Sequence, residues 1–272
     1  MHFAVKSSGL RSRTHSAVPA RHQPLSAMCS ENAKRKDPPI VTTSPRHIGI
    51  AACSAEGAAL CYRTICSEGS RWLGPHGHPE VSMHTPSLAA YVHALEHHDM
   101  DAVAGLMLDS ARKLAAAGAD FIICPDNTIH QAFDLVAPQS PLPWLHIADV
   151  VAQEAQARGY RQLGITGTRW LVESDVYPRQ LEARGLKWLR PAEPDRMRMG
   201  QIIMDELVPG VIQPASVQWF HQLMARLADQ GCDAVVLGCT ELPLIVHEGQ
   251  APVPTLDSTR LLARAALRRA LA

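Results

Sequence analysis

Two short polar clusters mark the places where this sequence could do chemistry. The first is Asp126-Asn127-Thr128 and the second is Cys239-Thr240-Glu241, and each follows an apolar run typical of a buried strand. In open α/β sheets, ligands bind beyond the carboxyl ends of the strands. A carboxylate and a thiol on opposite faces of one bound carbon can remove a proton from one side and return one to the other. The pattern therefore predicts racemisation without a cofactor.

The two clusters belong to a repeat that runs through the chain. Cys239 stands 113 residues after Asp126. On either side the same order continues: residues 163–165 repeat residues 48–50, and residues 252–257 repeat residues 141–146. Matches in one order at nearly one spacing indicate two similar halves. If the halves face each other, Asp126 and Cys239 lie across a single cleft.

Short apolar runs alternate with helical patterns between these motifs. We expect strands at 46–52, 121–124, 162–166 and 234–237, and helices at 102–117, 217–229 and 258–271. Continuous apolar strands between helices indicate parallel sheet covered on both faces. The predicted fold class is α/β, with two pseudosymmetric domains, each a parallel sheet flanked by helices, and the active site in the cleft between them.

The repeat also predicts domain boundaries. The first α/β domain is expected at 46–158 and the second at 159–257, with the last helix, about 258–271, packing back on the first domain. Residues 1–45 are rich in Ser, Arg, His and Pro and show no apolar periodicity. We expect them to be a disordered N-terminal extension.

The composition argues against several classes of protein. Lys+Arg and Asp+Glu number 26 each in 272 residues, so the formal net charge is zero, unlike that of a typical nucleic-acid binder. No apolar run approaches the roughly 18–20 residues that span a bilayer, so no membrane partner is expected. Seven cysteines without a CxxC motif favour a reducing, cytoplasmic setting over a disulfide framework.

Cofactors and metals are not expected either. The chain has five lysines, three of them in the N-terminal extension, and none is well placed to form a Schiff base with a cofactor such as pyridoxal phosphate. His76 and His78 form a pair, but no third ligand stands at a fixed spacing from them, so no metal site is predicted.

Several motifs together resemble a known family. They are Asp-Asn-Thr-Ile-His at 126–130, Leu-His-Ile-Ala-Asp at 145–149, Gly-Thr-Arg at 167–169 and Gly-Cys-Thr-Glu-Leu at 238–242. From about residue 47 onward the chain resembles the aspartate/glutamate racemase superfamily, most closely its aspartate or broad-specificity amino-acid racemase branch. The resemblance implies a pseudosymmetric enzyme in which two cysteines, or one cysteine and a substitute, exchange protons with the substrate Cα.

The resemblance assigns roles to particular residues. Cys239 takes the second cysteine position, and Asp126 stands at the first, where the family usually has a cysteine. For proton transfer near neutral pH, the pKa of Asp126 must be raised and the pKa of Cys239 lowered. His130 is expected to support the Asp126 loop. The polar residues expected to bind substrate are Ser54, Thr85, Asn127, Thr128, Thr240 and Glu241.

The other cysteines are expected to have no chemical role. Cys53, Cys61, Cys66 and Cys232 are interpreted as structural. Cys124 lies two residues too early in the chain to be equivalent to the first family cysteine.

The leading hypothesis is a cofactor-independent racemase of an acidic amino acid, aspartate or glutamate. Since one thiol remains at the two family positions, a one-thiol decarboxylase or cis–trans isomerase of a dicarboxylic acid stays open. A non-catalytic protein that binds a small acid is the alternative from another class. The expected partner is a small carboxylate substrate, and a homodimer is an assembly common in the family.

Overall fold

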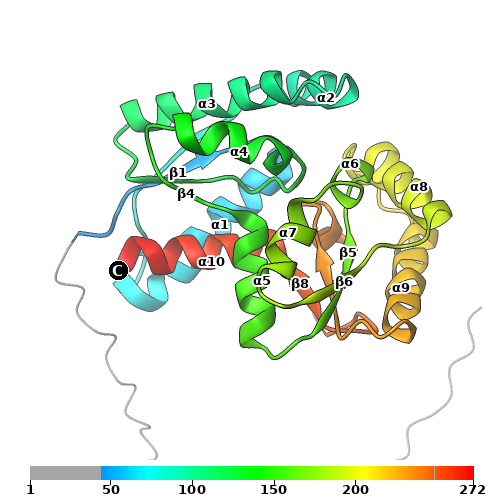
Figure 1. Cartoon of the computed structure of the whole chain (residues 1–272). Helices are drawn as coiled ribbons and strands as arrows, with labels where there is room; N and C mark the ends of the chain where they lie inside the picture. Colours follow the sequence, from blue (N-terminus) through cyan, green and yellow to red (C-terminus); the bar gives the residue numbers. More distant parts are fainter. Residues whose placement is uncertain (1–43, 248) are drawn as a thin grey trace, which may run out of the picture. The chain divides into compact units, whose positions relative to one another are not determined.

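Two parallel four-stranded sheets with the same internal order form the framework of the protein (Figure 1). The structure is a computed structural model that describes residues 44–247 and 249–272, within the unit Pro38–Ala272. The strand order is β2-β1-β3-β4 in one sheet and β6-β5-β7-β8 in the other, with every pair parallel. The predicted α/β class is confirmed. The extension predicted at 1–45 lies outside the described residues, apart from residues 44 and 45.

The first half alternates strands with helices up to residue 157. Its strands are β1 (Ile48–Ala51), β2 (Val81–His84), β3 (Phe121–Ile123) and β4 (Trp144–Leu145). Its helices are α1 (Ala55–Leu73), α2 (Leu88–Glu96), α3 (Met100–Ala116), α4 (Phe133–Val136) and α5 (Ile147–Ala157), with 3₁₀ turns η1 (Thr128–Ala132) and η2 (Ala137–Gln139).

The second half repeats this order. Its strands are β5 (Gln162–Thr166), β6 (Lys187–Leu189), β7 (Ala234–Leu237) and β8 (Thr255–Asp257). Its helices are α6 (Arg169–Val172), α7 (Val176–Glu182), α8 (Glu193–Ile202), α9 (Pro214–Asp229) and α10 (Ser258–Leu271), with a π-helical turn η3 (Ile203–Leu207) and a 3₁₀ turn η4 (Leu242–Leu244). In the part of the chain that the structure describes, no helix has both the length and the apolar character needed to cross a membrane.

The repeated Gly-x-Asp motif has the same physical role in both halves. Gly118 and Gly231 have φ angles of +89° and +92°, a conformation that glycine adopts without strain as it ends α3 and α9. The aspartate two residues later then accepts a hydrogen bond from the backbone at the start of the central strand. The two distances are 2.7 Å from His47 N to Asp120 Oδ2 and 3.1 Å from Gln162 N to Asp233 Oδ1.

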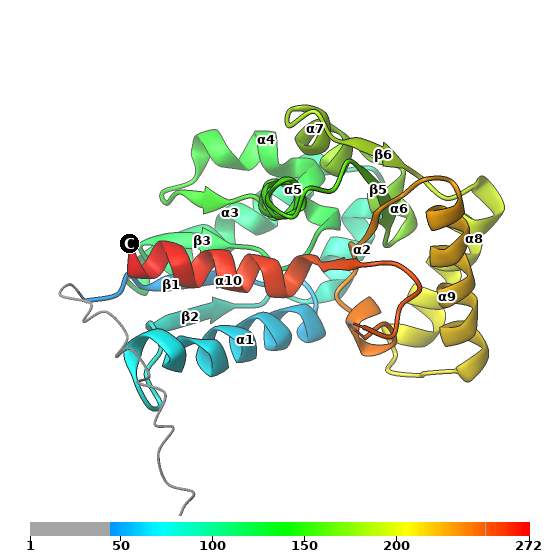
Figure 2. The same ribbon diagram turned by 90° about the horizontal axis from the view of Figure 1, so that it is seen from below.

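The last helix of the chain lies against helices of the first half. Figures 1 and 2 both show α10 beside α1 and α5, and it contacts both. Arg264 on α10 forms an ion pair with Glu68 on α1, with 2.9 Å between Nη2 and Oε1. Because α10 follows β8 as α5 follows β4, these two helices are equivalents in the repeat. Their contact joins the two halves.

A close approach at the start of α1 also joins the halves. A Cβ atom placed on Gly57 would overlap the methyl group of Thr240 and reach the Pro125 carbonyl oxygen at 3.0 Å. Only glycine therefore lets α1 lie this close to the loop after β7. Gly105 on α3 offers a contrast, since a Cβ there would meet no atom within 4 Å.

We predict that Gly57→Ala lowers the free energy of unfolding by about 1–3 kcal/mol, because the added methyl group overpacks the contact with Thr240. Gly105→Ala is the matched control. It should raise the free energy of unfolding by roughly 0.5–1 kcal/mol, since alanine costs less backbone entropy in a helix. Urea unfolding of both variants measures the two effects. If both substitutions changed the free energy of unfolding by the same amount, the close approach of Gly57 to Thr240 would be contradicted.

Candidate active site

The carboxyl ends of the central strands of both sheets open onto one small cavity of about 50 Å³. In the first sheet Ile50 of β1 is paired with Ile123 of β3, and in the second Thr166 of β5 is paired with Leu237 of β7. In each sheet, the loops that follow the two central strands therefore start side by side at the carboxyl ends of those strands. The polar residues that line the cavity are Cys53, Ser54, Asp126, Asn127, Thr128, Thr168, Cys239, Thr240 and Glu241. Asp126 and Cys239 thus line the same cavity.

The second half contributes a thiol that is hydrogen-bonded to a carboxylate. Cys239 Sγ donates to Glu241 Oε2 at 2.8 Å, and the Thr240 hydroxyl donates to the same oxygen at 2.7 Å. The Thr240 hydroxyl also lies 3.1 Å from the hydroxyl of Ser54, which follows β1. All four side chains are buried. This loop is thereby fastened to the first half at the wall of the cavity.

The first half contributes Asp126, whose carboxylate is held by its own loop. Oδ1 accepts a hydrogen bond from the Ile129 backbone at 3.1 Å, so Asp126 caps the turn η1. The thiol of Cys53 lies beside this carboxylate in the cavity wall. Burial, aided by the charge of Glu241, raises the pKa of Asp126 from 3.8 to about 6, although the Ile129 N–H and the Cys53 thiol oppose the rise. The upward shift expected for Asp126 is confirmed.

The pKa of the Cys239 thiol shifts in the direction opposite to the expectation. Burial raises the pKa of Cys239 well above its ordinary value, and the neighbouring Glu241 carboxylate raises it further. The Glu241 backbone N–H acts in the opposite direction but does not outweigh these two effects. The expected lowering of the Cys239 pKa is therefore wrong for the site without a ligand. A positive charge brought in by a ligand would favour the thiolate.

Asn127 and Thr128 are held by contacts between the two halves. The Asn127 amide accepts from the Tyr177 hydroxyl at 2.7 Å and donates to the Ser258 hydroxyl at 3.0 Å. The hydroxyl of Thr128 lies 2.9 Å from that of Thr168, which follows β5. Since the Asn127 oxygen and one of its N–H donors are already engaged, its side chain fixes the loop more than it offers free groups to a ligand.

His130 lies behind the Asp126 loop with both ring nitrogens in use. Nδ1 lies 2.7 Å from the Asp126 carbonyl oxygen and so donates to it, while Nε2 accepts from the Ile147 backbone at 3.4 Å. Burial and the nearby His146 ring lower the pKa of His130 well below its ordinary value. The imidazole is therefore neutral, and its contacts suit a residue that positions the loop.

Thr85 does not take part in this arrangement. It is exposed and is not among the residues that line the cavity. Thr85 follows β2, which is the edge strand of its sheet, so the loop that carries it starts away from the central strands. The expectation that Thr85 binds substrate is not supported.

Two polar residues of the lining, Cys53 and Thr168, were missed by the sequence analysis. Cys53, interpreted there as structural, is 4% exposed and lies beside Asp126 in the cavity. Its position directly after β1, next to Ser54, was the available signal. Thr168 follows β5 in the same way and belonged to the Gly-Thr-Arg motif at 167–169.

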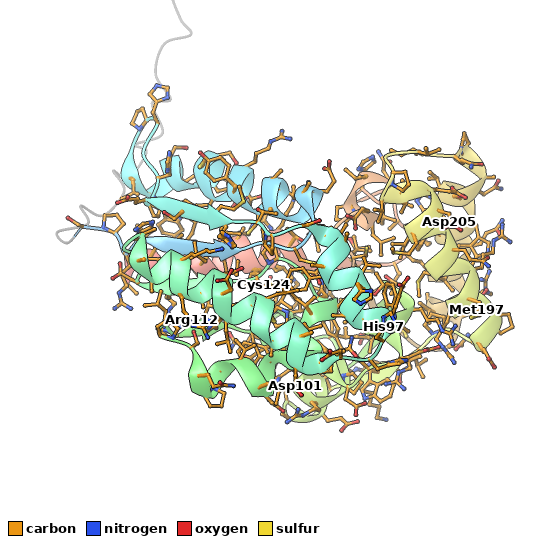
Figure 3. All side chains as sticks on the ribbon, turned by 90° about the horizontal axis from the view of Figure 1, so that it is seen from above. His97, Asp101, Arg112, Cys124, Met197 and Asp205 are labelled. Atoms are coloured by element: carbon orange, nitrogen blue, oxygen red, sulfur yellow. The ribbon has the colours of Figure 1, made fainter. Side chains whose placement is uncertain are left out.

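The rest of the cavity wall is apolar. Leu88, Val92, Leu95, Ile129, Trp170, Met204 and Val208 line it, and no Lys, Arg or His is among the described lining residues. Trp170 and Met204 also line an outer hollow of about 450 Å³. Figure 3 labels Met197 and Asp205, which line this hollow from the segment α8–η3. Trp170 and Met204 thus separate the inner cavity from this outer hollow.

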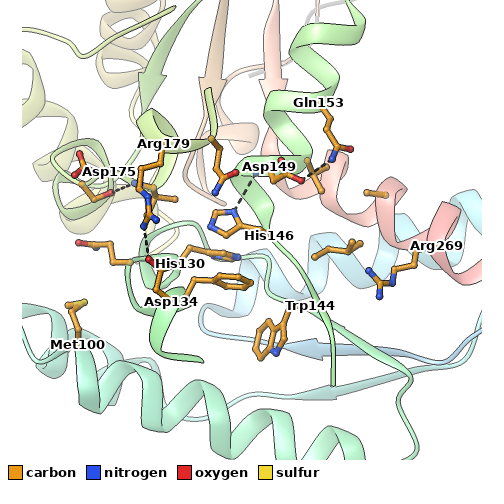
Figure 4. Close-up of a pocket in the computed structure, with 18 of the residues that line it drawn as sticks. Met100, His130, Asp134, Trp144, His146, Asp149, Gln153, Asp175, Arg179 and Arg269 are labelled. Carbon is orange, nitrogen blue, oxygen red and sulfur yellow. Dashed lines mark hydrogen bonds and ion pairs between the residues drawn. The ribbon is translucent and has the colours of Figure 1, made fainter. Parts of the chain in front are cut away.

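A larger hollow of about 900 Å³ lies away from this chemistry (Figure 4). His146, Trp144 and Arg179 line it, and Arg179 forms a 2.6 Å ion pair with Asp134. His130 is the only predicted site residue among those that line it, and neither Cys239 nor Asp126 does. The smaller cavity is therefore the candidate active site.

Comparisons with known proteins agree with this fold. The family model described as Asp/Glu/hydantoin racemase matches residues 50–266. The broad-specificity amino-acid racemase RacX of Bacillus subtilis (strain 168) is 25% identical over 177 residues, which are 64% of this chain and 75% of RacX.

Solved structures are similar over most of the chain. A Yersinia pestis protein assigned as an Asp/Glu racemase is 30% identical, with a TM-score of 0.77 over 84% of this chain and 100% of that one. An aspartate racemase homologue from Pyrococcus horikoshii OT3 is 26% identical, with a TM-score of 0.72 and the same coverage of both chains.

The raised pKa of Asp126 predicts how stability depends on pH. Above about pH 6 the folded protein must hold this charge in a partly buried place, whereas in the unfolded chain the carboxyl ionises near pH 3.8. Asp126→Asn keeps an oxygen for the Ile129 N–H and should raise the free energy of unfolding by roughly 1–3 kcal/mol at pH 8. The gain should vanish near pH 4, where the wild-type carboxyl is protonated in the folded state.

Urea unfolding at the two pH values measures this difference. Asp134→Asn is the control, because that carboxylate is exposed and its ion pair with Arg179 should contribute less than about 1 kcal/mol at either pH. If Asp126→Asn destabilised the protein equally at pH 4 and pH 8, burial would not be the cause of the shifted pKa.

Proposed function

Because the chain belongs to the Asp/Glu/hydantoin racemase family, we propose that it is a cofactor-independent racemase of an acidic amino acid, aspartate or glutamate. The named relatives include amino-acid and glutamate racemases, which are isomerases. The observation that carries the proposal is the placement of Cys239 and Asp126, one from each half, in a single cavity.

In this proposal Asp126 and Cys239 handle the protons on opposite faces of the substrate Cα. Groups near neutral pKa transfer protons most effectively at neutral pH, and the pKa of Asp126, at about 6, fits that requirement. Thr128 offers a hydroxyl group to the substrate carboxylate, whereas the Ser54 and Thr240 hydroxyl protons are engaged with Thr240 and Glu241. Glu241 accepts the Cys239 proton, while Asn127 and His130 hold the Asp126 loop in place.

The charges of the cavity favour a substrate that carries an ammonium group. Asp126 and Glu241 both line the cavity, and no cationic side chain is among the described lining residues. An α-ammonium group would meet two carboxylates and would stabilise a thiolate beside it. A dicarboxylic acid without an amino group would bring only further negative charge. This argues for an amino-acid racemase over a dicarboxylate decarboxylase or isomerase.

The apolar wall favours a second candidate substrate class. Leu88, Leu95, Trp170 and Met204 offer contact to an apolar side chain, whereas a side-chain carboxylate would find only neutral donors. A racemase of amino acids with apolar side chains is therefore the alternative within the same reaction. RacX, a relative over 177 residues, is named as a broad-specificity racemase.

The cavity must open before any amino acid can enter. A volume of about 50 Å³ has room for only a few water molecules. Trp170 and Met204 separate this space from the outer hollow of about 450 Å³, and they are the side chains whose movement would join the two. We assign the closed form to the state in which water is excluded from the reacting carbon.

The proposal extends to the organisation of the chain. The two domains are placed at 46–158 and 159–257, with α10 packed on the first, and the protein is placed in the cytoplasm as a homodimer. Light scattering tests the dimer, and cell fractionation tests the location.

We predict that the wild-type protein in D2O exchanges the Cα hydrogen of aspartate or glutamate and equalises their enantiomers. Cys239→Ala should slow this reaction by about 10²–10⁴-fold, the usual contribution of a general acid or base. NMR of the Cα proton and chiral chromatography measure exchange and inversion. The panel includes leucine for the apolar candidate and dicarboxylic acids, with CO2 release and double-bond isomerisation monitored as well.

Cys232→Ala is the matched control, because Cys232 is buried in the same half but does not line the cavity. It should leave the rate within about threefold. Binding of these acids without exchange, CO2 release or isomerisation would instead identify a protein that only binds small acids. A decarboxylation or isomerisation product without racemisation would also overturn the proposal.

A further inference from the structure

We propose that Cys53, in place of direct transfer by Asp126, is the thiol that meets the substrate Cα on the Asp126 side, with Asp126 as its proton acceptor. The inference rests on the proposed racemase function and assigns that cavity a second catalytic thiol. The spacing of the repeat does not reveal this second thiol. Cys239 follows β7, whose equivalent in the first half is β3, whereas Cys53 follows β1.

The strand register brings Cys53 to the Asp126 loop. β1 and β3 are adjacent in the sheet, so the residues that follow them leave the sheet side by side. The Cys53 thiol lies beside the Asp126 carboxylate, and both residues line the cavity. The two groups also interact, since each shifts the pKa of the other. Ser54, the next residue, reaches the hydroxyl of Thr240 at 3.1 Å. Cys53 is thus held between the Asp126 loop and the opposing half.

The arrangement repeats the one on the other side. Cys239 Sγ donates to the Glu241 carboxylate at 2.8 Å, and Cys53 lies beside the Asp126 carboxylate in the same cavity. Each half therefore presents one thiol with one carboxylate acceptor to the same cavity. The two pairs also interact electrostatically, since the charge of Glu241 raises the pKa of Asp126 and the charge of Asp126 raises the pKa of Cys239.

The nearby Cys124 does not meet the same requirements. Its thiol contacts the Asp126 backbone oxygen at 3.8 Å rather than the carboxylate, and it does not line the cavity. Cys124, labelled in Figure 3, belongs to the same apolar cluster as Cys53, so the cavity lining is what distinguishes the two thiols. Of the cysteines that the structure describes, only Cys53 and Cys239 line the cavity.

The proton transfers balance without any further reactant. The Cys53 thiol gives its proton to Asp126, and the thiolate then takes the proton from Cα, so that the Cα–H bond breaks as a new S–H bond forms. The electron pair left on Cα takes the proton of the Cys239 thiol on the opposite face, and the configuration inverts. In the reverse direction Cys239 is the base and Glu241 accepts its proton. Protons redistribute through solvent when the product leaves.

The experiment compares Cys53→Ser and Cys239→Ser in D2O, starting from each pure enantiomer of the substrate that the wild-type protein racemises. A serine hydroxyl keeps the size of the side chain but is a far weaker acid than a thiol. Cys66→Ser is the matched control, because Cys66 is half-buried on α1 and does not line the cavity. The measured quantities are inversion and deuterium incorporation at Cα.

We expect both cavity variants to lose racemisation by at least about 100-fold, while each still exchanges the Cα hydrogen of one enantiomer. The enantiomer should be opposite in the two variants, because each retains the thiol on one face only. Cys66→Ser should stay within about threefold of the wild-type rate. Racemisation by Cys53→Ser within about threefold of wild type would overturn the assignment, as would exchange of the same enantiomer by both cavity variants.

A second readout does not depend on turnover. The infrared S–H stretching band lost in Cys53→Ser should shift in the wild-type protein as pH passes through about 6, where Asp126 ionises, and should not shift in Asp126→Asn. If the S–H band did not shift with pH in the wild-type protein and was the same in Asp126→Asn, the pairing of Cys53 with Asp126 would be overturned even if racemisation were found. Absence of turnover on every substrate, with the band shifting as expected, would overturn the proposed function and leave the pairing intact.

Discussion

The constraint on which the site depends is the removal from solvent of two acidic groups, Glu241 fully and Asp126 partly, without a cation beside them. Asp126 and Glu241 line one cavity together with the thiols of Cys53 and Cys239, and no Lys, Arg or His is among its described lining residues. Hydrogen bonds from the Cys239 thiol, hydroxyls and backbone N–H groups take the place of a counter-ion. Such a site holds protons tightly until a ligand brings positive charge, which suits chemistry that moves protons on and off a carbon atom.

The same constraint explains why the halves must dock closely. The Thr128–Thr168 and Ser54–Thr240 hydroxyl pairs, and the contact of Gly57 with Thr240, all cross between the halves at the wall of the cavity. At this wall Glu241 is buried and Asp126 is partly buried. The apolar residues Trp170 and Met204 complete the enclosure on the side of the outer hollow.

The repeat allowed much of this to be predicted from the sequence. Equivalent strands at a nearly constant offset fix which residues stand at the carboxyl ends, so Asp126 and Cys239 could be placed in one cleft before the structure was known. Cys53 and Thr168 were missed because their role depends on which loops meet when the halves dock. Thr85 was misplaced because the sequence does not show that β2 is an edge strand, and the pKa of Cys239 depends on a burial that no motif encodes.

The protonation of Asp126 is the most direct test of this account. Carbon-13 NMR of protein labelled at the aspartate carboxyl carbons, with Asp126→Asn to assign the signal, measures the pH at which Asp126 ionises. The account predicts a pKa of about 6 that falls when Glu241→Gln removes the facing charge. A pKa near the ordinary value of about 3.9, unchanged in Glu241→Gln, would contradict it.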